Sequence, residues 1–114
     1  MAVSFNGYNE TLVTFQAGTG TKKGIPVKLN ADREVAACAA NNLFCGKCVA
    51  VSGGYASVQL TGYVKLPYTG TAPAVGYTML AADGSGAVKT VASGGRTHLV
   101  IDVDTAANLV GLIL

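Results

Sequence analysis

Three cysteines lie close together in the sequence and are the first candidates for chemistry. Cys45 and Cys48 form a Cys-x-x-Cys pair, and Cys38 precedes that pair by seven residues. A structural zinc site takes four Cys or His ligands, so the three thiols would need His98, the single histidine, as the fourth. His98 has no ligand spacing around it. We therefore expect no metal site, with Cys38 and Cys48 serving as small buried apolar side chains.

A redox role for the Cys-x-x-Cys pair is also not favoured. A thioredoxin-type pair stands at the start of a helix that follows a strand, where the helix terminus lowers the pKa of the thiol. Here Cys48 leads directly into Val49-Ala50-Val51, which has the composition of a strand.

Two further motifs resemble nucleotide sites only in composition. Gly18, Gly20 and Gly24 do not fit G-x-G-x-x-G, because the third glycine would fall at Lys23. A P-loop needs Gly-Lys-Ser/Thr, whereas Lys23 precedes Gly24, and the extended Ile25-Pro26-Val27 follows where a helix is required. A surface loop explains these glycines better.

The sequence also offers few residues for acid–base or nucleophilic catalysis. A serine or cysteine nucleophile would depend on His98 as its base, and His98 alternates with Leu99 and Ile101 as an outward residue of an expected strand. Carboxylate pairs are confined to Asp32 with Glu34 and Asp102 with Asp104, each beside a predicted turn, where acids commonly cap turns and strand edges. The sequence thus predicts no active site, no cofactor and no enzymatic activity.

Composition and charge narrow the class of protein further. The chain has 114 residues, 50% of them apolar and only 12% charged, with a net charge of +2 and no cluster of cations. This excludes a nucleic-acid-binding stripe, and the longest apolar stretch, residues 109–114, is far below the ~20 residues of a membrane span. The N-terminus lacks the pattern of a secretory signal, so we expect folding in a cytoplasm with reduced thiols. So low a charged fraction indicates surface hidden against partners, and therefore assembly.

Period-two alternation predicts strands along most of the chain. Residues 48–52 and 55–60 flank Gly53-Gly54, which suits a type I′ hairpin turn. Residues 78–82 and 87–91 flank Asp83-Gly84-Ser85-Gly86, and residues 97–103 are expected to pair with 109–114. Further strands are predicted at residues 10–16 and 26–29, whereas the alanine-rich residues 34–42 leave a short helical turn open.

These elements predict an all-β fold: a single small barrel or sandwich of short antiparallel strands, with residues 1–9 as an extended N-terminal arm and residues 10–114 as one domain. The expected core residues are Val49, Val51, Ala56, Val58, Leu60, Leu99, Ile101, Val103 and Leu112.

The order of the pieces resembles the small β-rich capsid decoration (cement) proteins of bacteriophages. Gly24-Ile25-Pro26-Val27 opens a strand, Val58 to Pro67 fits a V-x-L-x-G-x-V-x-L-P strand, Val75 to Leu80 resembles their V-G-x-x-L strand, and the Gly-rich Asp83 to Gly86 follows. The similarity spans residues 24–114. The cysteine cluster is not explained by it.

The resemblance implies a non-enzymatic virion protein that is made in the host bacterial cytoplasm and binds the outer surface of an assembled capsid. Its partner would be the lattice of major capsid protein, and it would be a homo-oligomer, with a trimer favoured. Alternatives that stay open are another small virion subunit, such as a tail-tube or head-completion protein, and a bacterial β-barrel binding module.

The N-terminal arm is the candidate contact with the capsid. Val3, Phe5 and Tyr8 are spaced by small and polar residues, so the arm is apolar enough to dock yet poorly placed to join the core. A segment of this kind orders only when its target surface exists.

The missing fourth ligand leads to a test by elemental analysis. Purified protein is expected to contain no stoichiometric zinc. One zinc atom per chain, lost together with folding on chelation, would contradict this expectation.

Overall fold

The computed structural model describes residues 10–114, and within that range it contains strands, turns and loops but no helix. The all-β prediction is confirmed. The short helical turn considered possible at residues 34–42 is wrong, because a strand begins at Glu34. The ten strands are β1 Thr11–Ala17, β2 Pro26–Ala31, β3 Glu34–Ala37, β4 Gly46–Ser52, β5 Tyr55–Thr61, β6 Tyr63–Pro67, β7 Gly76–Ala82, β8 Val88–Thr90, β9 Arg96–Asp104 and β10 Leu109–Ile113.

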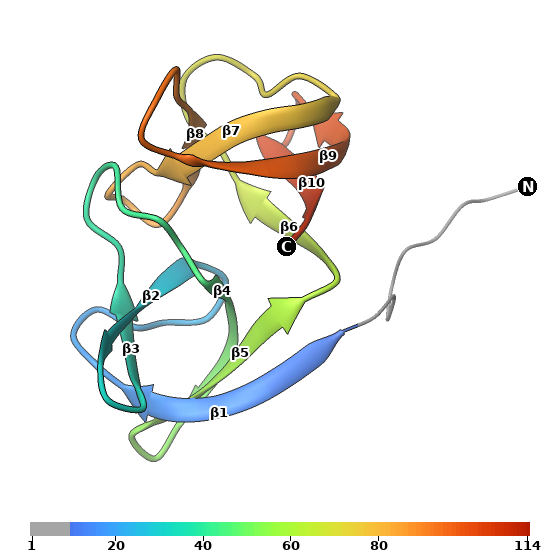
Figure 1. Cartoon of the computed structure of the whole chain (residues 1–114). Helices are drawn as coiled ribbons and strands as arrows, with labels where there is room; N and C mark the ends of the chain where they lie inside the picture. Colours follow the sequence, from blue (N-terminus) through green and yellow to red (C-terminus); the bar gives the residue numbers. More distant parts are fainter. Residues whose placement is uncertain (1–9) are drawn as a thin grey trace, which may run out of the picture.

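The first five strands close into a barrel in the order β1-β3-β2-β4-β5 (Figure 1). Its interior is filled by apolar side chains from several of these strands and the loop before β2: Ile25, Val27, Val35, Cys48, Ala56 and Val58. The expectation of antiparallel strands throughout is wrong at one place, where β1 and β3 pair in parallel at Gln16↔Glu34 and Ala17↔Val35. Strand directions cannot alternate all the way around a ring with an odd number of strands, so one parallel pair is unavoidable.

The remaining strands form an antiparallel five-stranded sheet in the order β6-β10-β9-β7-β8, which the sequence did not separate from the barrel. The sheet curls until its two edge strands meet, since Tyr68 bridges to Val88 and the Thr69 N–H donates to the Val88 carbonyl at 3.0 Å. Its concave face encloses a second apolar core that includes Val64, Leu66, Leu80, Val100, Val110 and Leu112.

Residues 38–45, which connect two strands of the barrel, join the two sheets. Cys38 and Phe44 pack within the core of the five-stranded sheet. Beside them, the Asn41 N–H donates to the Ala82 carbonyl and the Ala82 N–H donates to the Asn42 carbonyl, both at 2.9 Å. The assignment of residues 10–114 to a single domain stays a prediction.

The predicted hairpins are confirmed. Gly53 and Gly54 adopt φ values of 60° and 83°, as a type I′ turn requires, and join β4 to β5. β7 pairs with β8 around the Asp83–Gly86 turn, and β9 pairs with β10.

The predicted core was partly right. Ala56, Val58 and Leu112 are buried, and Leu60 and Val103 pack against the two cores. Val49 is only half-buried, because Cys48 takes the inward position and the register shifts between Cys48 and Ala50. Val51 pairs with the buried Ala56 but is itself 41% exposed.

Between His98 and Ile101, β9 faces the core with the residues opposite to those expected. Leu99 and Ile101 are half-buried, whereas His98 and Val100 are buried. Leu99, Val100 and Ile101 are an unbroken apolar run, so alternation alone did not fix which side of β9 faces inward.

Gly111 is required by a hydrogen bond on the outer face of the five-stranded sheet. The Tyr63 hydroxyl, from β6, reaches across β10 and donates to the Asp102 carboxylate on β9, at 3.0 Å from Oδ1 and 3.1 Å from Oδ2. Gly111 lies on β10 between them, and a Cβ there would collide with Asp102 Oδ1 and the Tyr63 hydroxyl.

Replacing Gly111 by alanine is therefore expected to lower the free energy of unfolding by about 1–3 kcal/mol, measured by denaturant unfolding. The direction of the change in the free energy of unfolding is informative, because replacing glycine by alanine in an unobstructed strand is normally stabilising. In a Tyr63→Phe background the cost of Gly111→Ala should be smaller, because one of the two obstructing oxygens is gone. A Gly111→Ala variant as stable as the native chain would refute this role.

Candidate functional site

The cysteine cluster has the properties of buried structural thiols. Cys38 is 8% exposed, Cys48 is fully buried and Cys45 is half-buried, and all three are free. Burial, together with the neighbouring Cys45, raises the pKa of Cys38 to about 11, and burial raises the pKa of Cys45 and of Cys48. The thiolate is the reactive form, so these thiols are poor nucleophiles at neutral pH. The prediction that Cys38 and Cys48 are buried apolar side chains is confirmed.

His98 was expected to point outward, and that prediction is wrong. Its side chain is 3% exposed and stacks on the Phe44 ring, with centroids 5.0 Å apart and an interplanar angle of 10°. Nδ1 lies 3.3 Å from the Ile113 carbonyl oxygen, a contact in which Nδ1 carries the proton. Nε2 is buried and finds no hydrogen-bond partner within residues 10–114. Burial lowers the pKa of His98, so the ring stays neutral and serves packing.

The acidic pairs are engaged in turns and strands, as the sequence indicated. Asp104 accepts hydrogen bonds from the N–H groups of Ala106 and Ala107 at 3.0 and 3.1 Å, which caps the turn between β9 and β10. Glu34 accepts from the Asn30 side chain at 2.9 Å. In the part of the chain that the structure describes, no group of three or more His, Cys, Asp or Glu side chains is arranged to hold a metal ion.

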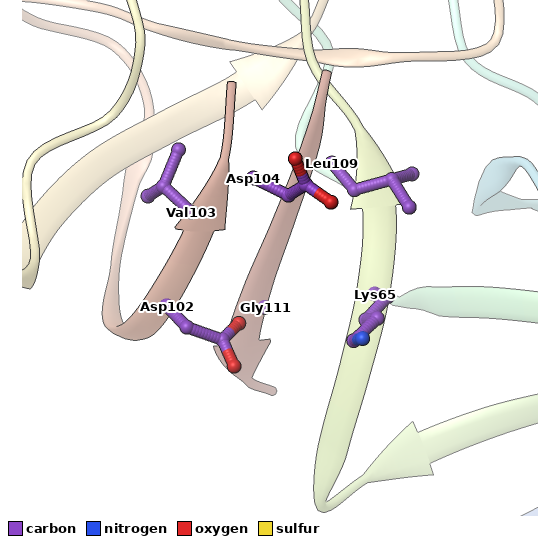
Figure 2. A pocket seen from close by; sticks show the side chains of 6 residues that line it. All are labelled: Lys65, Asp102, Val103, Asp104, Leu109 and Gly111. Carbon is purple, nitrogen blue, oxygen red and sulfur yellow. The ribbon is translucent and has the colours of Figure 1, made fainter. Parts of the chain in front are cut away.

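A small hollow lies on the outer face of the five-stranded sheet (Figure 2). Lys65, Gly111 and Asp102 are cross-strand neighbours in it, and Asp104 stands on the same side of β9 as Asp102. The hollow has a volume of about 160 Å³. Ligand pockets are typically several hundred Å³, so this one does not enclose an organic substrate.

A wider depression of about 650 Å³ lies at the barrel, lined by Gln16, Leu29, Asp32 and Arg33. All four residues are exposed, so it is a dent in the surface and not an enclosed pocket. Within residues 10–114, then, the candidate functional features are surfaces.

Large apolar side chains are exposed on both sheets. On the barrel, Leu12 is 58% exposed, Leu29 60% and Tyr55 56%. At the five-stranded sheet, Tyr77 of β7 is 79% exposed, and Val75, in the loop just before β7, is 70% exposed. On the outer face, Tyr77 is followed across the neighbouring strands by Leu99 and Ile113, which are half-buried, and by Tyr63, which is buried.

Sequence reasoning missed this outer row, although a signal for it was present. β9 and β10 carry apolar residues in both alternating sets, which is unusual for a sheet with one solvated face. Exposed apolar surface of this kind is typical of protein–protein contacts and agrees with the low charge of the chain.

The predicted capsid-contacting residues Val3, Phe5 and Tyr8 lie outside the described residues. No helix within residues 10–114 is long and apolar enough to cross a bilayer.

No protein-family model matches the sequence, and a search of curated proteins finds no match either. Among solved structures, the chain is similar to the head fiber gp8.5 N base of bacteriophage phi29. The TM-score is 0.66 at 16% sequence identity, and the match covers 92% of this chain and 93% of that chain. At this level of identity the comparison establishes a common fold.

The buried, neutral state of His98 predicts loss of stability in acid. Because its pKa is lowered in the folded protein, the unfolded chain binds the proton more readily below the usual histidine pKa of about 6.5. The free energy of unfolding should therefore fall as the pH drops below about 6.5, by at most about 1.4 kcal/mol per pH unit, until the folded protein also takes up the proton; denaturant titration measures this. A His98→Gln variant should lack this component, and an identical pH profile for the two proteins would contradict the assignment.

Proposed function

We propose that this chain is a non-enzymatic structural protein of a phage virion that binds the outer surface of an assembled capsid and stabilises it. The observation that carries the proposal is the fold shared with the phi29 head fiber base over 92% of the chain. The phi29 protein is the base of a head fiber. The motifs of residues 24–114 independently resemble those of capsid decoration proteins.

The surface chemistry supports the same function. A capsid-stabilising protein needs rigid structure and apolar surface for subunit contacts, and both sheets expose large apolar side chains such as Leu12 and Tyr77. The partner would be the lattice of major capsid protein, where repetition strengthens weak contacts through avidity. The protein would act as a homo-oligomer, for which the resemblance favours a trimer.

The base of a head fibre is the second candidate function, favoured by the description of the phi29 relative. Both roles place the chain on the outside of a phage head, and they differ in whether a further protein is attached to it. A ligand-binding barrel is not supported, because Val27, Val35 and Val58 fill the barrel interior and are fully buried.

Binding to assembled shells, as opposed to free capsid protein, tests the proposal. In co-sedimentation, the protein should pellet with shells at saturable stoichiometry and stay in solution with unassembled subunits. Decorated shells should also withstand higher temperature or osmotic stress than bare ones. If decorated and bare shells rupture under the same conditions, the stabilising role is refuted.

The N-terminal arm is proposed to supply part of the contact through Val3, Phe5 and Tyr8. Replacing all three by serine should weaken binding to shells by roughly tenfold or more, since each buried apolar side chain contributes a few kcal/mol. The melting temperature of the isolated protein should stay nearly unchanged. Ser4→Ala with Asn6→Ala is the matched control in the same arm and should bind normally. Equal occupancy by the serine variant would remove the arm from the contact.

A further inference from the structure

One edge of the barrel is left open along β1. β1 pairs with β5 from Thr11 to Gln16, but it meets β3 only at Gln16 and Ala17. Within residues 10–114, no strand pairs with the other edge of residues 11–15. Figure 1 shows β1 running along the barrel, with β3 beside one end of it.

The hydrogen bonds at the end of β1 show which backbone groups face this open edge. The Ala17 N–H donates to the Gly54 carbonyl on the β5 side at 2.9 Å, and the Gln16 N–H donates to the Arg33 carbonyl on the opposite side at 2.8 Å. Backbone groups of successive strand residues point to opposite edges. Thr14 and Leu12 therefore direct their N–H and C=O groups outward, as Gln16 does.

Side chains do not cover or protect this edge. Leu12 is 58% exposed and Val13 37% exposed, although they point to opposite faces of the strand. Proteins usually protect edge strands with charges, proline or short length. β6 has Lys65 and Pro67, and β8 is three residues long and contains Lys89. β1 has seven residues with no charge and no proline.

We propose that the open edge of β1 pairs with β1 of a second copy of this chain, antiparallel about a two-fold axis at Val13. The groups that point outward then meet, with Leu12 opposite Thr14 of the second copy and Thr14 opposite its Leu12. Each of these two pairs exchanges two backbone hydrogen bonds.

The side chains of β1 suit pairing with themselves. In a two-fold antiparallel pair, Val13 faces Val13 of the second copy and Thr11 faces its Phe15, so β-branched and aromatic side chains are neighbours. Pairing of identical strands brings like charges together wherever a strand is charged, and β1 carries none. An unprotected edge that is free of charge is thus complementary to its own copy.

This contact is independent of the proposed binding to a capsid. A two-fold contact through β1 would join one copy, or one oligomer, to the next.

Disulfide trapping gives a direct test in the full chain. Two antiparallel residues that face each other at the two-fold axis have Cβ atoms about 4.5–5.5 Å apart, close enough for a disulfide after small adjustment. A Val13→Cys variant should form disulfide-linked dimers on mild oxidation. Thr14→Cys is the matched control, because Thr14 is exposed on the same strand but lies diagonally from its copy, and it should give roughly tenfold less dimer. The native chain, oxidised in parallel, shows how much dimer forms through the native Cys45.

A second measurement keeps the test decisive if a cysteine variant misfolds. In sedimentation at high concentration, Val13→Lys should give a smaller species than the native chain, because two lysines would face each other, whereas Val13→Thr should behave as the native chain does. Equal trapping at positions 13 and 14, or equal sedimentation of all three proteins, overturns the proposal. If Val13→Lys instead loses only its binding to shells, the edge belongs to a capsid strand and the self-pairing is wrong.

Discussion

The packing of Phe44 against His98 is the interaction on which much of the structure depends. Phe44 belongs to a loop of the barrel, yet its ring is 3% exposed within the core of the other sheet. Together with the backbone hydrogen bonds of Asn41 and Asn42 to Ala82, it fixes one sheet against the other. The stacked ring also explains why a histidine faces the core, because Phe44 supplies an aromatic partner in place of water. Once His98 and Val100 face inward, Leu99 must face outward. The half-buried Leu99 then lies on the outer face between Ile113 and the exposed Tyr77.

A second constraint is the odd number of strands in the barrel. Five strands cannot alternate in direction around a closed ring, and the parallel contact falls between β1 and β3. That contact includes only two residue pairs, so the barrel closes at one end of β1 and leaves the rest of its edge open. The open edge of β1 is therefore a consequence of how the barrel closes.

The sequence predicted the local structure well, and for physical reasons. Gly53-Gly54 supplies the positive φ angles of a hairpin turn, and Ala56, Ser57 and Val58 alternate cleanly between core and solvent. Cys38 and Cys48 were correctly interpreted as buried thiols. These features depend only on neighbouring residues, so alternation and turn chemistry were sufficient to find them.

Most of the failures were long-range. The division into two sheets depends on pairings between distant residues, such as Gln16 with Glu34 and Tyr68 with Val88. In β9 the unbroken run of Leu99, Val100 and Ile101 fits either orientation, and the orientation is fixed by tertiary contacts such as the stacking of His98 on Phe44. The open edge of β1 follows from which strands pair with it, although its lack of charge was visible in the sequence.

We propose an external position on a phage head for this chain, and the fold shared with the phi29 head fiber base supports that proposal. Electron cryo-microscopy of shells assembled with and without the chain tests it most directly. The account predicts added density at symmetric positions on the outer face of the lattice, into which the barrel and the five-stranded sheet fit, and no such density on bare shells. Identical maps of the two preparations at saturating protein would contradict it.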